Sequence, residues 1–170
     1  MRKIAITINV LRNLEGKIKE ILEKSEKPVP EIINIYDLQN VLGFETDEEF
    51  IEFMTENFLS IYGFVRLSEQ NLTITINSLA ETTKVIILSE DGKKLRPATL
   101  YFLSKSALEI DSVQFIDYNG INDGEYSLLI TEDPNLLTRE FKLTTMYKYE
   151  KSYNKHIDCG NTITTLSEIK

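Results

Sequence analysis

The sequence predicts an α/β fold, a three-layer, Rossmann-like arrangement built on a doubly wound parallel sheet. Short apolar runs such as Arg2–Asn9, Lys84–Ser89 and Tyr126–Ile130 alternate with stretches of helical periodicity. Strands separated by helices pair in parallel through right-handed crossovers. The run Arg2–Asn9 is rich in β-branched residues and apolar almost throughout, which is typical of a strand covered on both faces. We therefore expect this strand at the centre of the sheet.

Three helices are predicted between the first strand and the second. Leu14–Lys24 carries an apolar stripe opposite Glu and Lys residues, and a proline-containing stretch ends it. Thr46 is the predicted N-cap of the next helix, with Glu49 in the capping-box position and an end near Ser60. Asn71–Thr82 has a helical apolar pattern despite its threonines. The middle helix is expected to bury Phe50, Phe53, Met54, Phe58 and Ile61.

The second half of the chain predicts the remaining strands. Lys84–Ser89 is a short apolar run closed by a turn signal, and Pro97 then begins a helix that extends to about Ala107. That helix is expected to turn Leu100, Leu103 and Ala107 inward. Further strands are predicted at Val113–Ile116, Tyr126–Ile130 and Phe141–Tyr149, the last of which should end the sheet.

Length and composition favour one domain spanning residues 1–170, with a helical, cap-like insertion at about residues 14–70. No apolar run approaches the roughly 18 residues of a membrane span, so a soluble protein without membrane partners is expected. The first residues lack the features of a signal peptide, which places the mature start at or near Met1. A single cysteine, Cys159, excludes an internal disulfide and favours a reducing interior such as the cytoplasm.

The net charge of -8 is unevenly distributed. Between Glu31 and Glu69 there are nine acidic residues and one basic residue, Arg66, so this segment alone accounts for the net charge. Such acidity argues against non-specific binding to nucleic acid, which requires neutralisation of phosphates. The acidic segment is either a solvated helix face that keeps the protein soluble or a surface for partners.

The opening residues Lys3–Asn13, KIAITINVLRN, resemble the start of the haloacid-dehalogenase-like (HAD-like) hydrolases. In that family a hydrophobic strand is followed by Asp-x-Asp-Gly-Val-Leu. Here Thr7 and Asn9 stand at the two aspartate positions, and the glycine is missing. Five further segments resemble the small, phage-encoded 5'(3')-deoxyribonucleotidase-like members of the family. They are LGFETDEEF, IYGF, VIILS, PATLYFLSK and LLITEDPNLL.

This resemblance implies chemistry that the chain is poorly equipped to perform. The family uses a nucleophilic aspartate, a second aspartate as general acid and base, and Mg²⁺. The hydroxyl of Thr7 needs an adjacent base before it can attack, and Asn9 cannot exchange a proton near neutral pH. Thr131 aligns with a metal-binding aspartate, which leaves Glu132 and Asp133 as the remaining candidate metal ligands.

Ser89 matches the phosphate-binding Ser/Thr of the family, and Arg96 or Lys94, with Lys93 beside it, matches the basic residue that steadies a phosphoryl group. These residues are candidates for an anion site. The alternative is that Ser89 caps a turn and that the basic side chains are solvated.

The C-terminal segment offers a candidate contact surface. Tyr147, Tyr149 and Tyr153, with Lys148 and Lys151 beside them, would form an aromatic and basic row if the last strand lay at the edge of the sheet. The alternative is an edge strand that its lysines protect against aggregation. The nearby His156, Asp158 and Cys159 have no partner motif and are expected in a surface loop.

Two functions from different classes follow. The first is a catalytically inactive HAD-like protein that needs no cofactor and binds other proteins or copies of itself. If it is phage-encoded, it belongs to the host cytoplasm and to the head–tail or tail assembly of the virion. The alternative is a divergent, Mg²⁺-dependent nucleotide phosphohydrolase. A non-catalytic nucleotide sensor is a third hypothesis.

Overall fold

The computed structural model describes residues 2–169 and contains one sheet of six parallel strands in the order β3-β2-β1-β4-β5-β6. The strands are β1 (Lys3–Thr7), β2 (Lys84–Ser89), β3 (Ser112–Phe115), β4 (Leu128–Thr131), β5 (Thr145–Tyr149) and β6 (Thr162–Ile163). The predicted parallel α/β sheet is therefore confirmed, and β1 is central, between β2 and β4.

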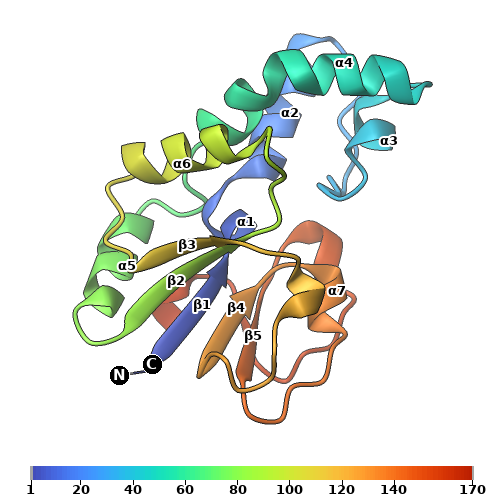
Figure 1. Cartoon of the computed structure of the whole chain (residues 1–170). Helices are drawn as coiled ribbons and strands as arrows, with labels where there is room; N and C mark the ends of the chain where they lie inside the picture. Colours follow the sequence, from blue (N-terminus) through green and yellow to red (C-terminus); the bar gives the residue numbers. More distant parts are fainter. Residues whose placement is uncertain (1, 170) are drawn as a thin grey trace.

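Helices of different lengths connect the strands (Figure 1). They are α1 (Ile8–Leu11), α2 (Leu14–Lys24), α3 (Leu38–Leu42), α4 (Asp47–Phe58), the π-helical turn η1 (Leu59–Gly63), α5 (Leu72–Ala80), α6 (Arg96–Lys105) and α7 (Pro134–Leu137), with short 3-10 turns η2 (Tyr118–Gly120), η3 (Ser152–Asn154) and η4 (Leu166–Glu168). Asn13 caps α2 by accepting a hydrogen bond from the Gly16 amide, and Thr46 caps α4 by accepting one from the Glu49 amide.

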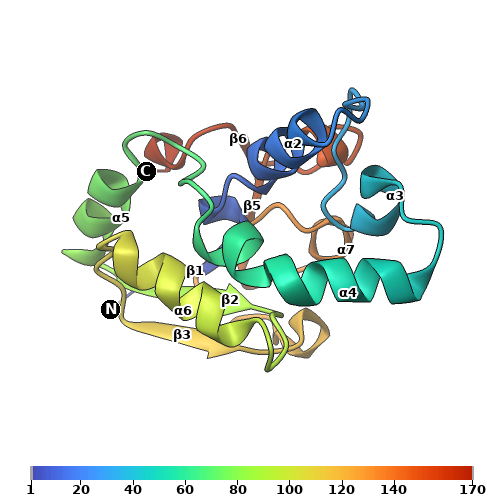
Figure 2. The ribbon, with the colours of Figure 1, turned by 90° about the horizontal axis from the view of Figure 1, so that it is seen from above.

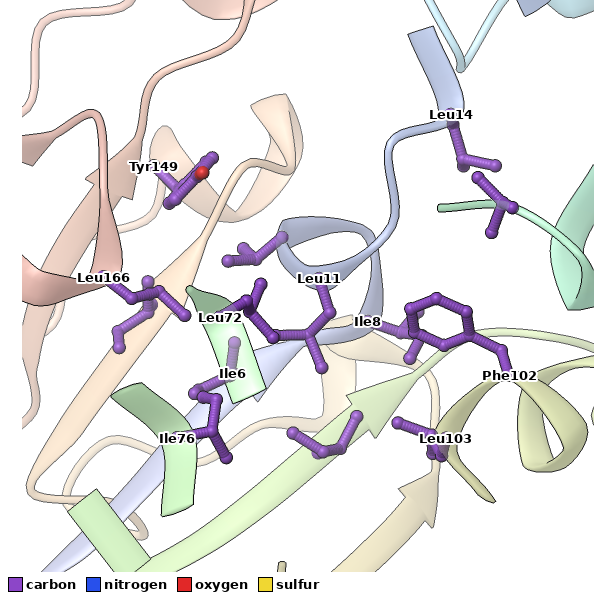
Figure 3. Packing of buried hydrophobic residues seen from close by; sticks show 14 of the residues in the cluster. Ile6, Ile8, Leu11, Leu14, Leu72, Ile76, Phe102, Leu103, Tyr149 and Leu166 are labelled. Atoms are coloured by element: carbon purple, nitrogen blue, oxygen red, sulfur yellow. The ribbon is translucent and has the colours of Figure 1, made fainter. Parts of the chain in front are cut away.

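Side chains alternate between the two faces of each strand, and each face has its own core. Ile4 and Ile6 of β1 face the larger core, which α2, α5 and α6 cover; Figure 3 shows part of it around Leu72 and Phe102. Ala5 faces a smaller core that is closed by η2, α7 and the chain between β3 and β4. None of the helices among residues 2–169 has the length and apolar character needed to cross a bilayer.

Between β1 and β2, helices α2, α3 and α4 lie above the end of the sheet at which β1 leads into α1, whereas α5 lies beside the sheet (Figure 1). Seen from above, α4 runs from the neighbourhood of α6 toward α3 (Figure 2). Although α4 forms as predicted, none of its own residues is fully buried; Ile61 of η1 is buried, whereas Phe50, Phe53, Met54 and Phe58 are half-buried. Phe44 packs on two of these rings, with centroid distances of 5.9 and 5.1 Å.

Three predicted details of the secondary structure are wrong. The first strand stops at Thr7, so Asn9 lies in α1 rather than in a strand. Helix α6 turns Ala98, Thr99, Phe102 and Leu103 inward and leaves Leu100 50% exposed, because the polar Thr99 has buried partners that rotate the helix. The last predicted strand does not end the sheet, since β6 pairs with β5.

Candidate functional site

The polar residues singled out in the sequence meet at the carboxyl edge of the sheet. Thr7 ends β1, Ser89 ends β2 and Thr131 ends β4, and all three side chains are completely buried. Ligands of open α/β sheets bind at this edge, in the crevice where the strand order reverses, which here lies between β1 and β4. The chemistry of this edge therefore depends on which partners these side chains already have.

Thr7 belongs to a buried cluster centred on Glu132. Its Oγ1 lies 2.6 Å from Glu132 Oε2 and 3.1 Å from Thr131 Oγ1. A hydroxyl has one proton, and the shorter contact assigns it to the carboxylate. The other carboxylate oxygen, Oε1, accepts a hydrogen bond of 2.6 Å from the Tyr36 hydroxyl. Both oxygens of Glu132 are thus engaged within the chain.

The surroundings of Glu132 raise the pKa of its carboxyl group. The residue is completely buried, and burial raises the pKa of its carboxyl although the hydroxyls of Thr7 and Tyr36 oppose the shift. Asn154 holds the adjoining backbone through a 2.9 Å hydrogen bond to the Glu132 carbonyl. The Tyr153 ring packs edge-on against Tyr36 at 5.8 Å, and its buried hydroxyl has no hydrogen-bond partner. Glu132 and Thr7 are thus buried, whereas Tyr36, which covers them, is itself 43% exposed.

Asn9 belongs to a second cluster, centred on the guanidinium of Arg12. Arg12 is 1% exposed; its Nε and Nη2 donate to Asn9 Oδ1 at 3.1 and 2.8 Å, and Nη2 also pairs with Asp91 at 3.0 Å. The hydroxyl of Thr99 donates to the same Asp91 oxygen, and the Tyr62 ring covers the guanidinium at 5.0 Å. The family's acid/base position is therefore occupied by an amide committed to an internal arginine.

The residues present do not fit a magnesium site of the kind the HAD-like fold implies. Glu132 is fully engaged, and Asp133 caps α7 by accepting hydrogen bonds from the amides of Asn135 and Leu136 at 2.7 and 3.0 Å. A hard cation needs several free oxygen ligands. Within residues 2–169 there is no group of three or more His, Cys, Asp or Glu side chains arranged to hold a metal ion.

The candidate anion residues are only partly brought together. Ser89 and Arg96 line the same cavity of about 450 Å³, whereas Lys94 is exposed and lines a separate groove beside α4. Ser89 Oγ accepts a hydrogen bond from the Asp91 amide at 3.1 Å, so it does cap a turn, and the Arg96 guanidinium stacks on Phe115 at 4.8 Å. The acidic side chains around this cavity are Glu90, Asp91 and Asp117. Their charge disfavours an anionic ligand.

The expectation of an exposed tyrosine row is wrong. Tyr149, Tyr153 and Lys148 are buried because β6 and the chain that follows β5 cover them, and only Tyr147 and Lys151 are half-exposed. Lys148 donates from Nζ to the Ile157 carbonyl at 2.8 Å, which ties the loop to the strand. Lys151 packs over the Tyr149 ring at 4.8 Å, and burial lowers its pKa. These residues build the interior of the C-terminal segment.

The remaining candidates lie where the sequence placed them, in a loop. His156 and Asp158 are exposed and Cys159 is a half-buried free thiol. Sequence reasoning missed Arg12 and Tyr36. Arg12 stands three residues after Asn9, a spacing that brings two side chains together on a helix, and this was the available signal. Nothing local marks Tyr36, because its partner Glu132 is distant in sequence.

Three solved structures resemble the chain along nearly its whole length. Two are described as crystal structures of a dehalogenase, one of them with an intermediate complex, and match with TM-scores of 0.59 and 0.57 at 12% and 11% identity. A HAD-superfamily hydrolase, subfamily IA, variant 1, from Geobacter sulfurreducens PCA matches with a TM-score of 0.54 at 10% identity. Each match covers 99% of this chain and 94–95% of the other.

No protein-family model matches the sequence, and no curated protein matches it significantly. At identities this low the structural matches show the fold alone. They confirm the predicted HAD-like α/β fold, in agreement with the observed order of the parallel strands.

Loss of Arg12 should be severely destabilising. Arg12→Ala removes the guanidinium that pairs with the Asp91 carboxylate and the Asn9 amide. We therefore expect the free energy of unfolding to fall by roughly 3–5 kcal/mol, as for other broken buried ion pairs. Urea denaturation followed by circular dichroism measures it. Lys24→Ala, which removes an exposed pair with Glu20, is the control and should change the free energy of unfolding far less. Equal losses for the two variants would contradict the assigned role of Arg12.

Glu132 should make stability depend on pH. Its folded-state pKa lies above the unfolded value of about 4.3, so the folded state binds more protons in this window and stability falls as pH rises above it. We expect the free energy of unfolding of the native chain, relative to Glu132→Gln, to decrease between about pH 4.5 and neutrality. Urea denaturation at several pH values tests this. A stability difference between the native chain and Glu132→Gln that grows with pH would refute the assignment.

Proposed function

We propose that this HAD-like chain does not carry out the aspartate chemistry of HAD hydrolases and acts as a structural or protein-interaction component. One observation carries the proposal: the polar side chains at the fold's usual ligand edge are bound to one another. Thr7 and Tyr36 donate to the two carboxylate oxygens of the buried Glu132, and Asn9 accepts from Arg12. Because these groups are already desolvated and paired, a phosphorylated substrate would have to displace internal hydrogen bonds to reach them.

The charge distribution supports interaction rather than turnover. The excess of acidic residues lies between Glu31 and Glu69, and α3 and α4 of this stretch lie over the carboxyl edge, where an anionic substrate would have to enter (Figure 1). Like charge opposes such a ligand and favours a partner with a basic surface. The buried tyrosines of β5 and η3 no longer offer a second face, so the acidic segment remains as the contact region.

The finer form of the proposal places the protein in a phage particle, in the head–tail or tail assembly, and in the host cytoplasm before assembly. It rests on the resemblance of several segments, LLITEDPNLL among them, to phage-encoded nucleotidase-like proteins. In that setting the chain needs no cofactor. Its partners are other proteins or further copies of itself.

Purified protein should not hydrolyse p-nitrophenyl phosphate or a deoxynucleoside monophosphate, with or without Mg²⁺, because the fold's nucleophile and acid/base positions hold Thr7 and Asn9. Release of nitrophenol or phosphate is the measurement, and an active phosphatase run in parallel is the control. Turnover of either substrate that EDTA abolishes would contradict the proposed non-catalytic function.

A second candidate, a divergent phosphohydrolase, is favoured by one contact. The Thr7 hydroxyl lies 2.6 Å from Glu132, whose raised pKa suits a general base. Glu132 could therefore serve as the adjacent base that a threonine nucleophile needs. In this candidate Thr7 Oγ1 forms a bond to phosphorus as the bond to the leaving oxygen breaks. Glu132 takes the hydroxyl proton and passes it to that oxygen. The complete burial of both residues requires Tyr36 to move first.

If this second candidate holds, mass spectrometry after incubation with p-nitrophenyl phosphate should find a phosphate on Thr7. Thr7→Val removes the hydroxyl and should abolish the adduct, and Glu132→Gln should reduce it by about 10²-fold or more, the usual range for a lost general base. The exposed Thr82→Val is the matched control. Absence of any adduct on Thr7 would eliminate the candidate.

A further inference from the structure

Helix α4 presents an apolar groove that no part of the described chain fills. A cavity of about 390 Å³ runs between α4 and the loop that leads into α6; its apolar walls come from Phe50, Ile51, Met54, Phe58 and Leu95, and Thr55 and Lys94 complete the lining. The helix has no fully buried residue, and Ile51 is 60% exposed. Burial of apolar surface is the main favourable term in association, so a groove of this composition gains from an apolar occupant.

An acidic ridge borders this groove. Glu48, Glu52 and Glu56 follow one another at four-residue spacing, which aligns them along one side of α4, next to Ile51 and Thr55. All three carboxylates are exposed, and the ion pairs formed within residues 2–169 include no side chain of α4. Like charges at this spacing repel one another, and a cationic partner relieves that repulsion.

We propose that the groove and the ridge together form a docking site for a basic amphipathic helix of a partner protein. Apolar side chains at one-turn spacing on that helix fill the groove, and Lys or Arg side chains beside them pair with Glu48, Glu52 and Glu56. This inference rests on the proposed interaction function and specifies the chemistry of its partner.

Charge complementarity selects this occupant over the others. A second copy of the chain brings another net charge of -8 to the same contact. Nucleic acids and anionic bilayers bring more negative charge still. A cationic helix is attracted at long range by the ridge and held at short range by the groove, so its association rate should fall as salt rises, whereas the apolar anchors set its residence time.

The test is a calorimetric titration of the full chain with a synthetic helical peptide of Leu and Lys, with Leu at positions i, i+3, i+4 and i+7. The heat of binding is measured. We expect saturable binding that Ile51→Asp weakens by about tenfold or more, since a charge in the groove opposes apolar anchors. The matched control is Ile74→Asp, because Ile74 is 69% exposed on α5, away from α4. The same peptide with Glu in place of Lys, and one with Ser in place of Leu, should not bind.

Charge reversal tests the ridge separately. Glu52→Lys with Glu56→Lys should weaken binding and reduce its salt dependence. Glu81→Lys with Glu109→Lys changes the net charge equally on other exposed residues and should leave binding unchanged.

The docking site is overturned if the Leu/Lys peptide does not bind, if the Glu peptide binds equally well, or if Ile51→Asp and Ile74→Asp behave alike. Sedimentation that shows self-association lost in Ile51→Asp would identify the occupant as a second copy and would also overturn it. These failures differ from that of the proposed function. Phosphatase turnover refutes the non-catalytic role whatever the peptide does, and lack of peptide binding without turnover removes only the docking site.

Discussion

The burial of one guanidinium constrains the architecture of this protein more than any other interaction. A charged group out of water costs several kcal/mol unless its hydrogen bonds are met, and Arg12 meets them with groups from separate elements. The single turn of α1 brings Asn9 to it, the turn after β2 brings Asp91, and η1 lays Tyr62 over it. Thr99 completes the arrangement and fixes the rotation of α6. The end of β1, the turn after β2 and two helical segments are thereby joined at one point.

The neighbouring cluster around Glu132 joins a different pair of regions. The carboxylate belongs to the loop after β4, whereas Tyr36 comes from the chain between α2 and α3. One hydroxyl therefore connects the segment above the sheet to the sheet itself. In a hydrolase of this fold the same edge would have to admit substrate and water. Here the polar side chains of that edge are hydrogen-bonded to one another.

The sequence predicted the elements whose signals are local. Leu14–Lys24 and Lys84–Ser89 match α2 and β2 residue for residue, because amphipathic periodicity and a bounded β-branched run depend on few neighbours. Predictions that needed long-range partners failed. The buried Thr99 of α6 faces Arg12, which is 87 residues away in the chain, and the burial of Tyr149 depends on β6, a strand too short to leave a pattern. The polar residues singled out in the sequence do lie together at the strand ends, but their internal partners Arg12 and Tyr36 could not be read from spacing alone.

The edges of the sheet limit how this protein can recognise others. An edge strand offers unpaired amides and carbonyls onto which a partner can add a strand of its own. At one edge β6 has only two residues, Thr162–Ile163, and at the other the four residues of β3 are half-buried, with Arg96 stacked over Phe115. Neither edge provides the long, flat backbone template that lets chains stack into fibres. Contacts with other molecules at these edges therefore depend on side chains rather than on pairing of exposed backbone.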